Sequence, residues 1–155
     1  MYLITGASRG IGQLLFDNLS SRGEICHGTY NSSSVTDHNN FSQVDVRSFD
    51  AVSKWVSGVV DESNSNNLVL INCAGISYSA FGHKSDIDQW RNVIDVNLIG
   101  SFNLIRAVLP YMRAANYGRI INFSSVVAQK GVPGTSAYAA SKSGLWGMTK
   151  ALSVE

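Results

Sequence analysis

The sequence predicts an α/β fold in which a doubly wound parallel sheet lies between two layers of helices. Short apolar runs rich in β-branched residues alternate with longer segments of helical period, and repeated strand–helix–strand order produces a parallel sheet with helices on both faces. Residues 68–71, Leu-Val-Leu-Ile, are continuously apolar, which is typical of a strand covered on both faces. Because 155 residues suit one domain and no repeat or linker interrupts them, residues 1–155 are expected to form a single domain.

Three strands are expected in the first half of the chain, at residues 2–4, 24–30 and 41–46, with a polar loop over 31–40. A helix between the first two strands is predicted from apolar spacing, and Gly23 is its expected C-terminal stop. The face predicted to point inward consists of Ile11, Leu14, Leu15, Asn18 and Leu19.

Two amphipathic helices are expected further along the chain. The first follows from Val52, Trp55, Val56, Val59 and Val60, and the Asn/Ser-rich residues 61–67 end it. The second is a long core-facing helix predicted from Ile87, Trp90, Ile94, Leu98, Phe102, Ile105, Leu109 and Met112. Strands are expected at residues 68–71 and 119–123, and a last helix from residue 137 to residue 155.

The composition excludes several classes of function. Twelve basic and eleven acidic side chains leave a net charge of +1, which provides no attraction to a phosphate backbone, and no apolar run approaches a membrane span. Neither nucleic acid nor a membrane is therefore an expected partner. Cys26 and Cys73 are isolated, which indicates reduced thiols in a cytoplasmic protein without a secretory signal, and no metal site is expected.

Residues 5–12 read Thr-Gly-Ala-Ser-Arg-Gly-Ile-Gly and lie between the first strand and the first helix. In such folds a dinucleotide pyrophosphate meets the helix N-terminus there, where backbone N–H groups are free. Glycines also form simple turns, so their placement rather than their number supports a cofactor site. The cofactor-binding residues expected in this turn are Gly6, Ser8, Arg9, Gly10, Ile11 and Gly12.

The end of the second strand bears on the choice of nicotinamide cofactor. An Asp or Glu at this place would bind the ribose 2′-hydroxyl of NAD and repel a 2′-phosphate, but the sequence has Tyr30, Asn31, Ser32 and Ser33. Arg9 supplies a cation and Asn31 a neutral donor, which favours NADP(H) over NAD(H). The alternative is that Arg9 is a solvated surface residue.

Tyr138 and Lys142 are four residues apart and therefore share one face of the last predicted helix. A free phenol has a pKa of about 10, and a neighbouring ammonium group favours the phenolate. Such a pair also arises by chance on helix surfaces. Ser125 favours the functional interpretation, because it follows the strand at residues 119–123, and ligands bind at the carboxyl ends of parallel strands.

This combination resembles the short-chain dehydrogenase/reductase family, whose cofactor motif is similar to residues 5–12. Residues 72–75, Asn-Cys-Ala-Gly, are similar to the family's Asn-Asn-Ala-Gly segment, residues 121–125 to the strand with the catalytic serine, and Asn97 to the helix asparagine. The similarity covers essentially the whole chain and points to the branch of 3-oxoacyl-acyl-carrier-protein reductases and related sugar or steroid dehydrogenases. It implies a Rossmann-like, three-layer α/β/α fold.

The resemblance implies four catalytic residues, Asn97, Ser125, Tyr138 and Lys142. Tyr138 would be the general acid in reduction and the general base in oxidation, and Ser125 would orient the substrate oxygen. Lys142 would bind the nicotinamide ribose, while Asn97 would hold a water in a proton relay to Lys142. Alternatively, Asn97 is a polar helix residue bonded only to the backbone.

The resemblance also implies further contacts to the cofactor. Asp45 and Val46 would contact the adenine by carboxylate and backbone; without the resemblance Asp45 is only a loop residue at a strand end. Tyr138 and Lys142 would touch the nicotinamide end. Asn31, Asn72, Ala74 and Gly75 complete the expected cofactor-binding set. Gln129 and residues 132–134 are expected at the substrate entrance.

The sequence departs from the family in two ways. Cys73 replaces the second Asn of the Asn-Asn-Ala-Gly segment, which removes an amide on the adenine side. Family members also continue with two more strands, a loop for the nicotinamide carboxamide and a substrate lid. The chain is therefore expected to be C-terminally truncated, without the last strands of the family fold, and the strand at residues 119–123 to form an open sheet edge.

The expected function is hydride transfer between NADP(H) and a carbonyl or secondary alcohol, with a 3-oxoacyl thioester, keto-sugar or steroid-like substrate. The cofactor would perform the hydride chemistry and the protein would manage the proton. Two alternatives stay open: a non-catalytic NADP-binding module, and a protein that self-associates through residues 137–147 without turnover. The resemblance implies a homodimer or homotetramer in which the helices at residues 87–112 and 137–155 pack against their counterparts.

Overall fold

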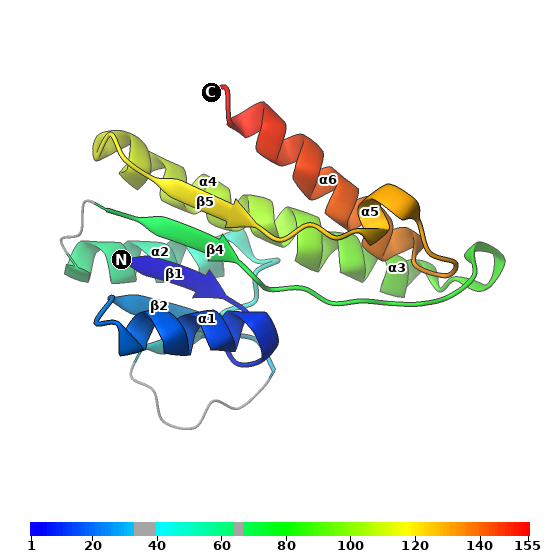
Figure 1. The fold of residues 1–155 in the computed structure, drawn as a ribbon, viewed down its shortest axis with the longest axis horizontal. Coiled ribbons are helices and arrows are strands. Elements are labelled where there is room, and N and C mark those ends of the chain that lie inside the picture. The colour runs from blue at the N-terminus through cyan, green and yellow to red at the C-terminus, as the bar shows by residue number, and fades with distance from the viewer. Residues whose placement is uncertain (33–39, 64–66) are drawn as a thin grey trace.

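The computed structural model describes residues 1–32, 40–63 and 67–155. Five parallel strands form one sheet in the order β3-β2-β1-β4-β5 (Figure 1). The chain starts at the centre, moves outward to β3 and returns to the other side of β1, which confirms the doubly wound sheet. The strands are β1 (Tyr2–Thr5), β2 (Cys26–Tyr30), β3 (Phe41–Gln43), β4 (Val69–Asn72) and β5 (Arg119–Asn122).

The helices lie between the strands and after β5, and the long helix predicted from residue 87 is present, although Ile87 and Phe102 of its predicted core-facing stripe are exposed. It is built from three consecutive pieces, α3 (Ile87–Ile94), the π-helical η2 (Asp95–Ile99) and α4 (Gly100–Ala114). The other helices are α1 (Gly10–Ser21), α2 (Phe49–Ser63), the short 3₁₀ helix η1 (Gly82–Lys84), α5 (Val127–Lys130) and α6 (Ser136–Leu152). The strand predicted at 24–30 begins only at Cys26, and the one predicted at 41–46 ends at Gln43.

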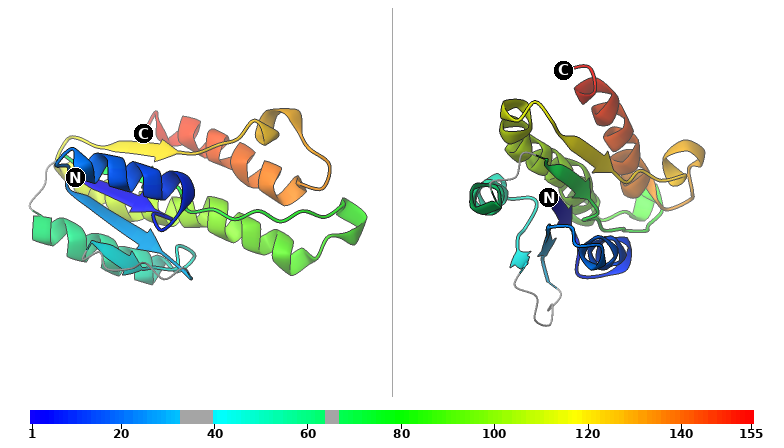
Figure 2. Two further views of the ribbon diagram at one scale, coloured as in Figure 1. Left: turned by 60° about the horizontal axis from the view of Figure 1, so that its bottom comes forward. Right: turned by 60° about the vertical axis from the view of Figure 1, so that its left-hand side comes forward.

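Helices lie on both faces of the sheet, as predicted (Figure 2). Side chains of a strand alternate between its faces, so Leu3 and Leu70 join one buried cluster, with α2, α4 and α6, whereas Ile4 and Ile71 join another, with α1. Among the described residues, α1 is the helix that covers the second face. It packs against β1 and β2, and burial on this face falls toward the β5 edge.

The inward face predicted for α1 is wrong in part. Ile11, Leu14 and Asn18 are exposed, whereas Gly12 and Phe16 are buried and Leu15 and Leu19 partly buried. The reason is a close backbone approach: a Cβ on Gly12 would lie 2.4 Å from the Gly6 carbonyl oxygen. Gly12 must therefore face the strand, and this rotates the helix so that residues four and seven positions later point inward.

The helix at Ile87–Ala114 is long and apolar enough to pass as a membrane span by length and composition. Half of its apolar window is buried inside the protein, where α4 packs against α2 and the sheet. This is the behaviour of a core helix, and the absence of a membrane partner stays a prediction. Residues 33–39 of the predicted loop, Ser33 included, and 64–66 of the second polar stretch lie outside the described part of the chain.

Candidate active site

The glycine-rich turn joins β1 to the N-terminus of α1. Gly6 and Gly10 have positive φ angles of +62° and +57°, which favour glycine. A Cβ on Gly6 would lie 2.8 Å from Ala74 Cα, so this glycine lets the turn pack against the segment after β4. At Gly10 no atom lies within 4 Å of such a Cβ. Gly6 and Gly12 thus allow close backbone packing, whereas Gly10 faces open space.

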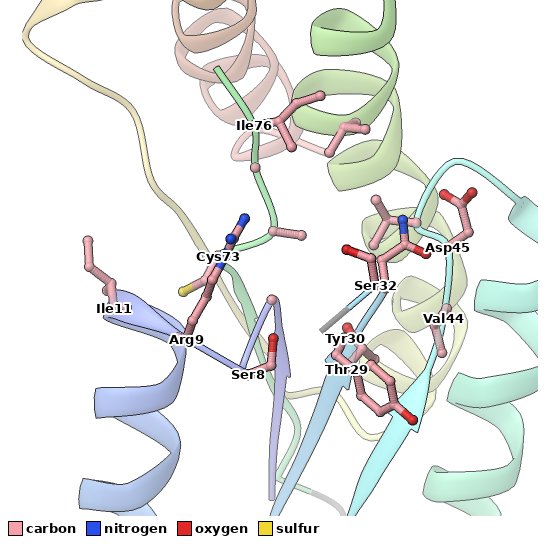
Figure 3. Close-up of a pocket in the computed structure, with 18 residues that line it drawn as sticks. Ser8, Arg9, Ile11, Thr29, Tyr30, Ser32, Val44, Asp45, Cys73 and Ile76 are labelled. Carbon is pink, nitrogen blue, oxygen red and sulfur yellow. The ribbon is translucent and has the colours of Figure 1, made fainter. Parts of the chain in front are cut away.

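A crevice of about 390 Å³ follows the carboxyl ends of β1, β2, β3 and β4 (Figure 3). Arg9 and Ser8 come from the glycine turn, Ser32 from the end of β2 and Asp45 from the segment after β3. The structure brings nearly all of the expected cofactor residues together here. Those that line the crevice are Gly6, Ser8, Arg9, Gly10, Ile11, Gly12, Asn31, Asp45, Val46, Ala74 and Gly75.

The lining fits a dinucleotide. Arg9 is the N-cap of α1 and its side chain caps no backbone N–H, so the first turn presents free donors to an anion. At the end of β2 the lining residues Tyr30, Asn31 and Ser32 are uncharged, so none of them repels a phosphate. The polar turn and the neutral strand end match the pyrophosphate and ribose of such a cofactor.

Asp45 is held by Arg47, two residues later. The guanidinium Nη2 lies 2.6 Å from Asp45 Oδ2 and Nε 2.9 Å from Oδ1, and Arg47 Nη1 donates to Asn92 Oδ1 at 2.8 Å. Hydrogen bonds from Arg47 lower the pKa of the Asp45 carboxyl. The carboxylate is therefore ionised and fixed in orientation at the wall of the crevice.

A second hollow, of about 650 Å³, contains Tyr138 and Lys142 from α6. It shares five lining residues with the first: Arg9, Ile11, Cys73, Gly75 and Ile76. The two hollows therefore adjoin along the turn and the segment after β4. An elongated ligand that lies in the first can reach the tyrosine and the lysine in the second.

Lys142 is buried, and its ammonium donates to the Phe123 carbonyl at 2.7 Å. Its Nζ lies 5.6 Å from the centre of the Tyr138 ring, so the two side chains lie on the same face of α6, as the helical spacing predicts. Burial lowers the pKa of Lys142, because the charged form loses hydration; the nearby Cys73 opposes this. One ammonium N–H is bonded to the Phe123 carbonyl, so two N–H donors remain for a ligand.

Ser125 follows β5, but it is not among the residues that line the second hollow. Its hydroxyl accepts the Val127 N–H at 3.2 Å, at the start of α5. Ser124 lines the hollow instead, and its hydroxyl donates to the Lys142 carbonyl at 2.9 Å. The structure thus places Ser125 beside α5 and Ser124 against α6.

Asn72 is expected in the cofactor set, yet the structure does not place it in the crevice. It is buried inside the sheet, where Nδ2 donates to Asn122 Oδ1 at 2.8 Å across β4 and β5. Within the described residues Asn72 Oδ1 has no hydrogen-bond partner. Its position as the last residue of β4 turns its side chain along the sheet, toward the paired residue of β5.

Asn97 is completely buried in η2 and meets no solvent. Its Oδ1 accepts the Ile76 N–H at 2.8 Å, and Nδ2 donates to the Ile76 carbonyl at 2.9 Å and to Ser141 Oγ at 3.1 Å. The backbone carbonyl of Asn97 accepts the Ser101 hydroxyl at 2.8 Å. The side chain joins the segment after β4 to α6, and its part in a water relay stays a prediction.

Cys73 borders both hollows, and burial raises the pKa of its thiol to about 11, against a smaller opposing effect of Lys142. Thr5 Oγ1 accepts the N–H groups of Cys73 and Ala74 at 3.1 and 3.0 Å, which fixes this segment against β1. The loop at residues 132–134, which is expected at the substrate entrance, lies beside Ala80, whose N–H donates to the Gly134 carbonyl at 2.9 Å.

Some lining residues could not be found from the sequence. Ile76 and Val96 border the crevice, but one is an ordinary apolar loop residue and the other belongs to the long apolar helix. The only available signal for Ile76 was its position directly after the Asn-Cys-Ala-Gly segment. Val96 gave none, because an apolar residue in a long apolar helix is typical of the core.

Comparisons with known proteins agree with this geometry. A family profile described as short chain dehydrogenase matches residues 1–155. The chain is 37% identical over 160 residues to an acetoacetyl-CoA reductase of Shinella zoogloeoides and 33% identical over 161 residues to the 3-oxoacyl-[acyl-carrier-protein] reductase FabG of Vibrio cholerae. In both cases 99% of this chain is aligned.

The fold is also shared with a solved structure, ligand-free aldohexose dehydrogenase from Thermoplasma acidophilum. The TM-score is 0.91 at 28% identity, and the match covers 99% of this chain and 60% of that one. The chain spans 66% of the length of the two reductases. Together with the glycine turn, the crevice and the Tyr138–Lys142 pair, the match over the full 155 residues shows that this chain belongs to the short-chain dehydrogenase family.

Proposed function

We propose that the protein transfers a hydride between NADP(H) and a carbonyl or secondary alcohol. The observation that carries the proposal is that Tyr138 and Lys142 line a hollow which adjoins the glycine-lined crevice through five common residues. A cofactor in the crevice can then meet a proton donor at its far end. The relatives named acetoacetyl-CoA reductase and 3-oxoacyl-[acyl-carrier-protein] reductase support a 3-oxoacyl thioester as substrate, with keto-sugars and steroids as further candidates.

In this proposal the glycine turn, Asn31, Asp45 and Val46 hold the cofactor along the crevice, and Lys142 holds its ribose. When bound, the cofactor supplies or accepts the hydride. The Tyr138 hydroxyl gives its proton to the substrate oxygen in reduction and takes it back in oxidation. Lys142 Nζ lies 5.6 Å from the centre of the Tyr138 ring, and both side chains line the same hollow. A seryl hydroxyl near the end of β5 orients the substrate oxygen, and Ser125 is the residue proposed for it.

NADP(H) is proposed over NAD(H) because the crevice has a cation at Arg9 and neutral side chains at the end of β2. We further propose that residues 1–155 act as one cofactor-binding domain of a cytoplasmic homodimer or homotetramer. Exposed aromatic side chains on α4 and α6, Phe102 and Trp146, support self-association of these helices.

The main alternative is a cofactor-binding or self-associating protein without turnover. It is favoured by one observation, that Ser125, the serine expected to orient the substrate, does not line the hollow that contains Tyr138 and Lys142. Cofactor binding depends on the crevice alone, whereas turnover also needs a closed substrate site. An experiment that measures both cofactor binding and the turnover rate therefore distinguishes the two functions.

The test measures NADPH oxidation by absorbance with 3-oxoacyl thioesters, keto-sugars and ketosteroids. Tyr138→Phe should lower kcat by about 10²–10⁴-fold, as expected for the loss of general acid catalysis, and leave NADPH binding within about threefold because the ring stays in place. Tyr117→Phe is the matched control, since Tyr117 lies before β5 and away from both hollows.

The possible outcomes distinguish the proposed functions. Turnover that survives Tyr138→Phe contradicts the proposed proton donor. NADPH binding without turnover on any substrate supports the binding protein, and the absence of both supports the self-associating one.

A further inference from the structure

Ser141 lies in α6 between Tyr138 and Lys142, and the proposed reaction gives it no part. Its side chain is completely buried, at 0% exposure, as is Asn97. Buried polar side chains are normally hydrogen-bonded, because an unpaired polar group gives up its bonds to water on folding. The partners of this hydroxyl therefore indicate its role.

The backbone of Ile76 fixes the direction of every bond in the group. An N–H can only donate and a carbonyl can only accept, so Asn97 Oδ1 faces the Ile76 N–H and Nδ2 faces the Ile76 carbonyl. The second Nδ2 proton then points to Ser141 Oγ at 3.1 Å. Ser141 must accept this bond, and its own proton goes to the Tyr138 carbonyl at 2.8 Å.

The arrangement joins three elements, namely the segment after β4, η2 and α6. Gly75, which precedes Ile76 in the segment after β4, lies between η2 and α6. A Cβ on Gly75 would be 3.3 Å from Asn97 Oδ1 and 4.0 Å from Lys142 Nζ. The segment that lines both hollows is thus held by Asn97, and Asn97 is held to α6 through Ser141. A shift of α6 would break this bond.

We propose that Ser141 is a positioning residue whose bond with Asn97 sets the place of Tyr138 and Lys142 against the cofactor crevice. Its effect on the reaction rests on the proposed function, whereas the bond between η2 and α6 does not. A second bond supports the same docking: Trp90 Nε1 of α3 donates to Ser136 Oγ at 3.1 Å. Ser136 and Ser141 therefore attach α6 to the long helix on either side of Tyr138.

Ser141→Ala tests the bond, with Ser153→Ala as the matched control. Both hydroxyls donate to the carbonyl three residues earlier at 2.8 Å, but Ser153 is exposed and, within the described residues, bonds to no other element. Amide hydrogen exchange over residues 136–146 should accelerate about tenfold in Ser141→Ala, while β1 and β4 keep their protection and Ser153→Ala changes neither. Unchanged exchange in α6, or equal acceleration throughout the sheet, would overturn the proposal.

Kinetics test the catalytic consequence. Ser141→Ala should lower kcat about tenfold and leave the KM for NADPH within about threefold, because the reacting groups are displaced while the crevice is intact. The Asn97→Ala/Ser141→Ala double variant should lose no more than Asn97→Ala alone, since both changes remove the same bond. Additive losses, or a KM effect as large as the kcat effect, contradict positioning. If the parent protein shows no turnover, the proposed function is contradicted. Amide hydrogen exchange still tests the bond between Ser141 and Asn97 in that case.

Discussion

Arg9 is the residue proposed to distinguish NADPH from NADH in the crevice. It is the N-cap of α1, and within the described residues its guanidinium makes no ion pair. A 2′-phosphate would give it a charge-assisted partner, whereas a 2′-hydroxyl would not. The same residue borders both hollows, so its side chain can reach a ligand in either.

Arg9→Ala should therefore weaken NADPH binding about tenfold, the equivalent of about 1.4 kcal/mol, and NADH binding less than about twofold. Cofactor fluorescence titration measures both constants. Arg22→Ala, at the other end of α1, is the control for general loss of positive charge. Equal losses for the two cofactors would mean that Arg9 does not contact the 2′-phosphate.

Cys73 should react slowly with alkylating reagents although it borders both hollows. A thiol pKa of about 11, against the ordinary value of 9.0, leaves about 100-fold less thiolate near pH 8. Iodoacetamide labelling of the Cys26→Ser variant, followed by mass spectrometry, should be slower than that of a free thiol by about this factor. Because the pKa is raised, the rate should keep rising with pH until about pH 11. A plateau near pH 9 would contradict the burial of the thiol.

At the scale of elements, the isoleucines on the α1 side of the sheet show how far one helix can cover it. Ile4, Ile71 and Ile121 are paired neighbours in β1, β4 and β5, and their exposed fractions are 0%, 4% and 45%. Burial therefore falls with distance from α1. In the described part of the chain β5 is an edge strand of the sheet, as predicted from the sequence.

The stability of two variants should follow this gradient. Ile71→Ala should lower the free energy of unfolding by about 2–5 kcal/mol, the usual range for a buried isoleucine, and Ile121→Ala by less than about 1 kcal/mol. Urea denaturation of the 155-residue chain measures both. A large loss for Ile121→Ala would show that another surface covers this strand in solution.

At the scale of the whole molecule, self-association is expected to use α4 and α6. Phe102 on α4 and Trp146 on α6 are exposed, and Lys150 lies over the Trp146 ring. Aromatic side chains of this kind are enriched in the centres of interfaces.

Phe102→Asp should raise the dissociation constant of an oligomer more than about tenfold, because it places a charge in an apolar contact. Sedimentation velocity at several concentrations measures the change. Phe81→Asp is the control, since Phe81 is an aromatic residue near η1 that is even more exposed, at 61% against 41% for Phe102. A monomeric parent protein, or an equal effect of both variants, would contradict an interface on these helices.

Local patterns in the sequence determined the strands, the long apolar helix and the relation of Tyr138 to Lys142. They are set by periods of two and of about 3.6 residues, so neighbours within a few positions suffice to predict them. The glycine turn belongs to the same class, because its residues are consecutive. This is why all six residues expected to bind the cofactor in the turn line one crevice.

The tertiary structure alone decided the features that depend on distant contacts. The rotation of α1 follows from the approach of Gly12 to Gly6, Asn72 turns toward Asn122 rather than the crevice, and Ser141 meets a side chain 44 residues away. Such contacts are fixed when whole elements pack and every buried polar group must find a partner. No pattern within one element contains that information.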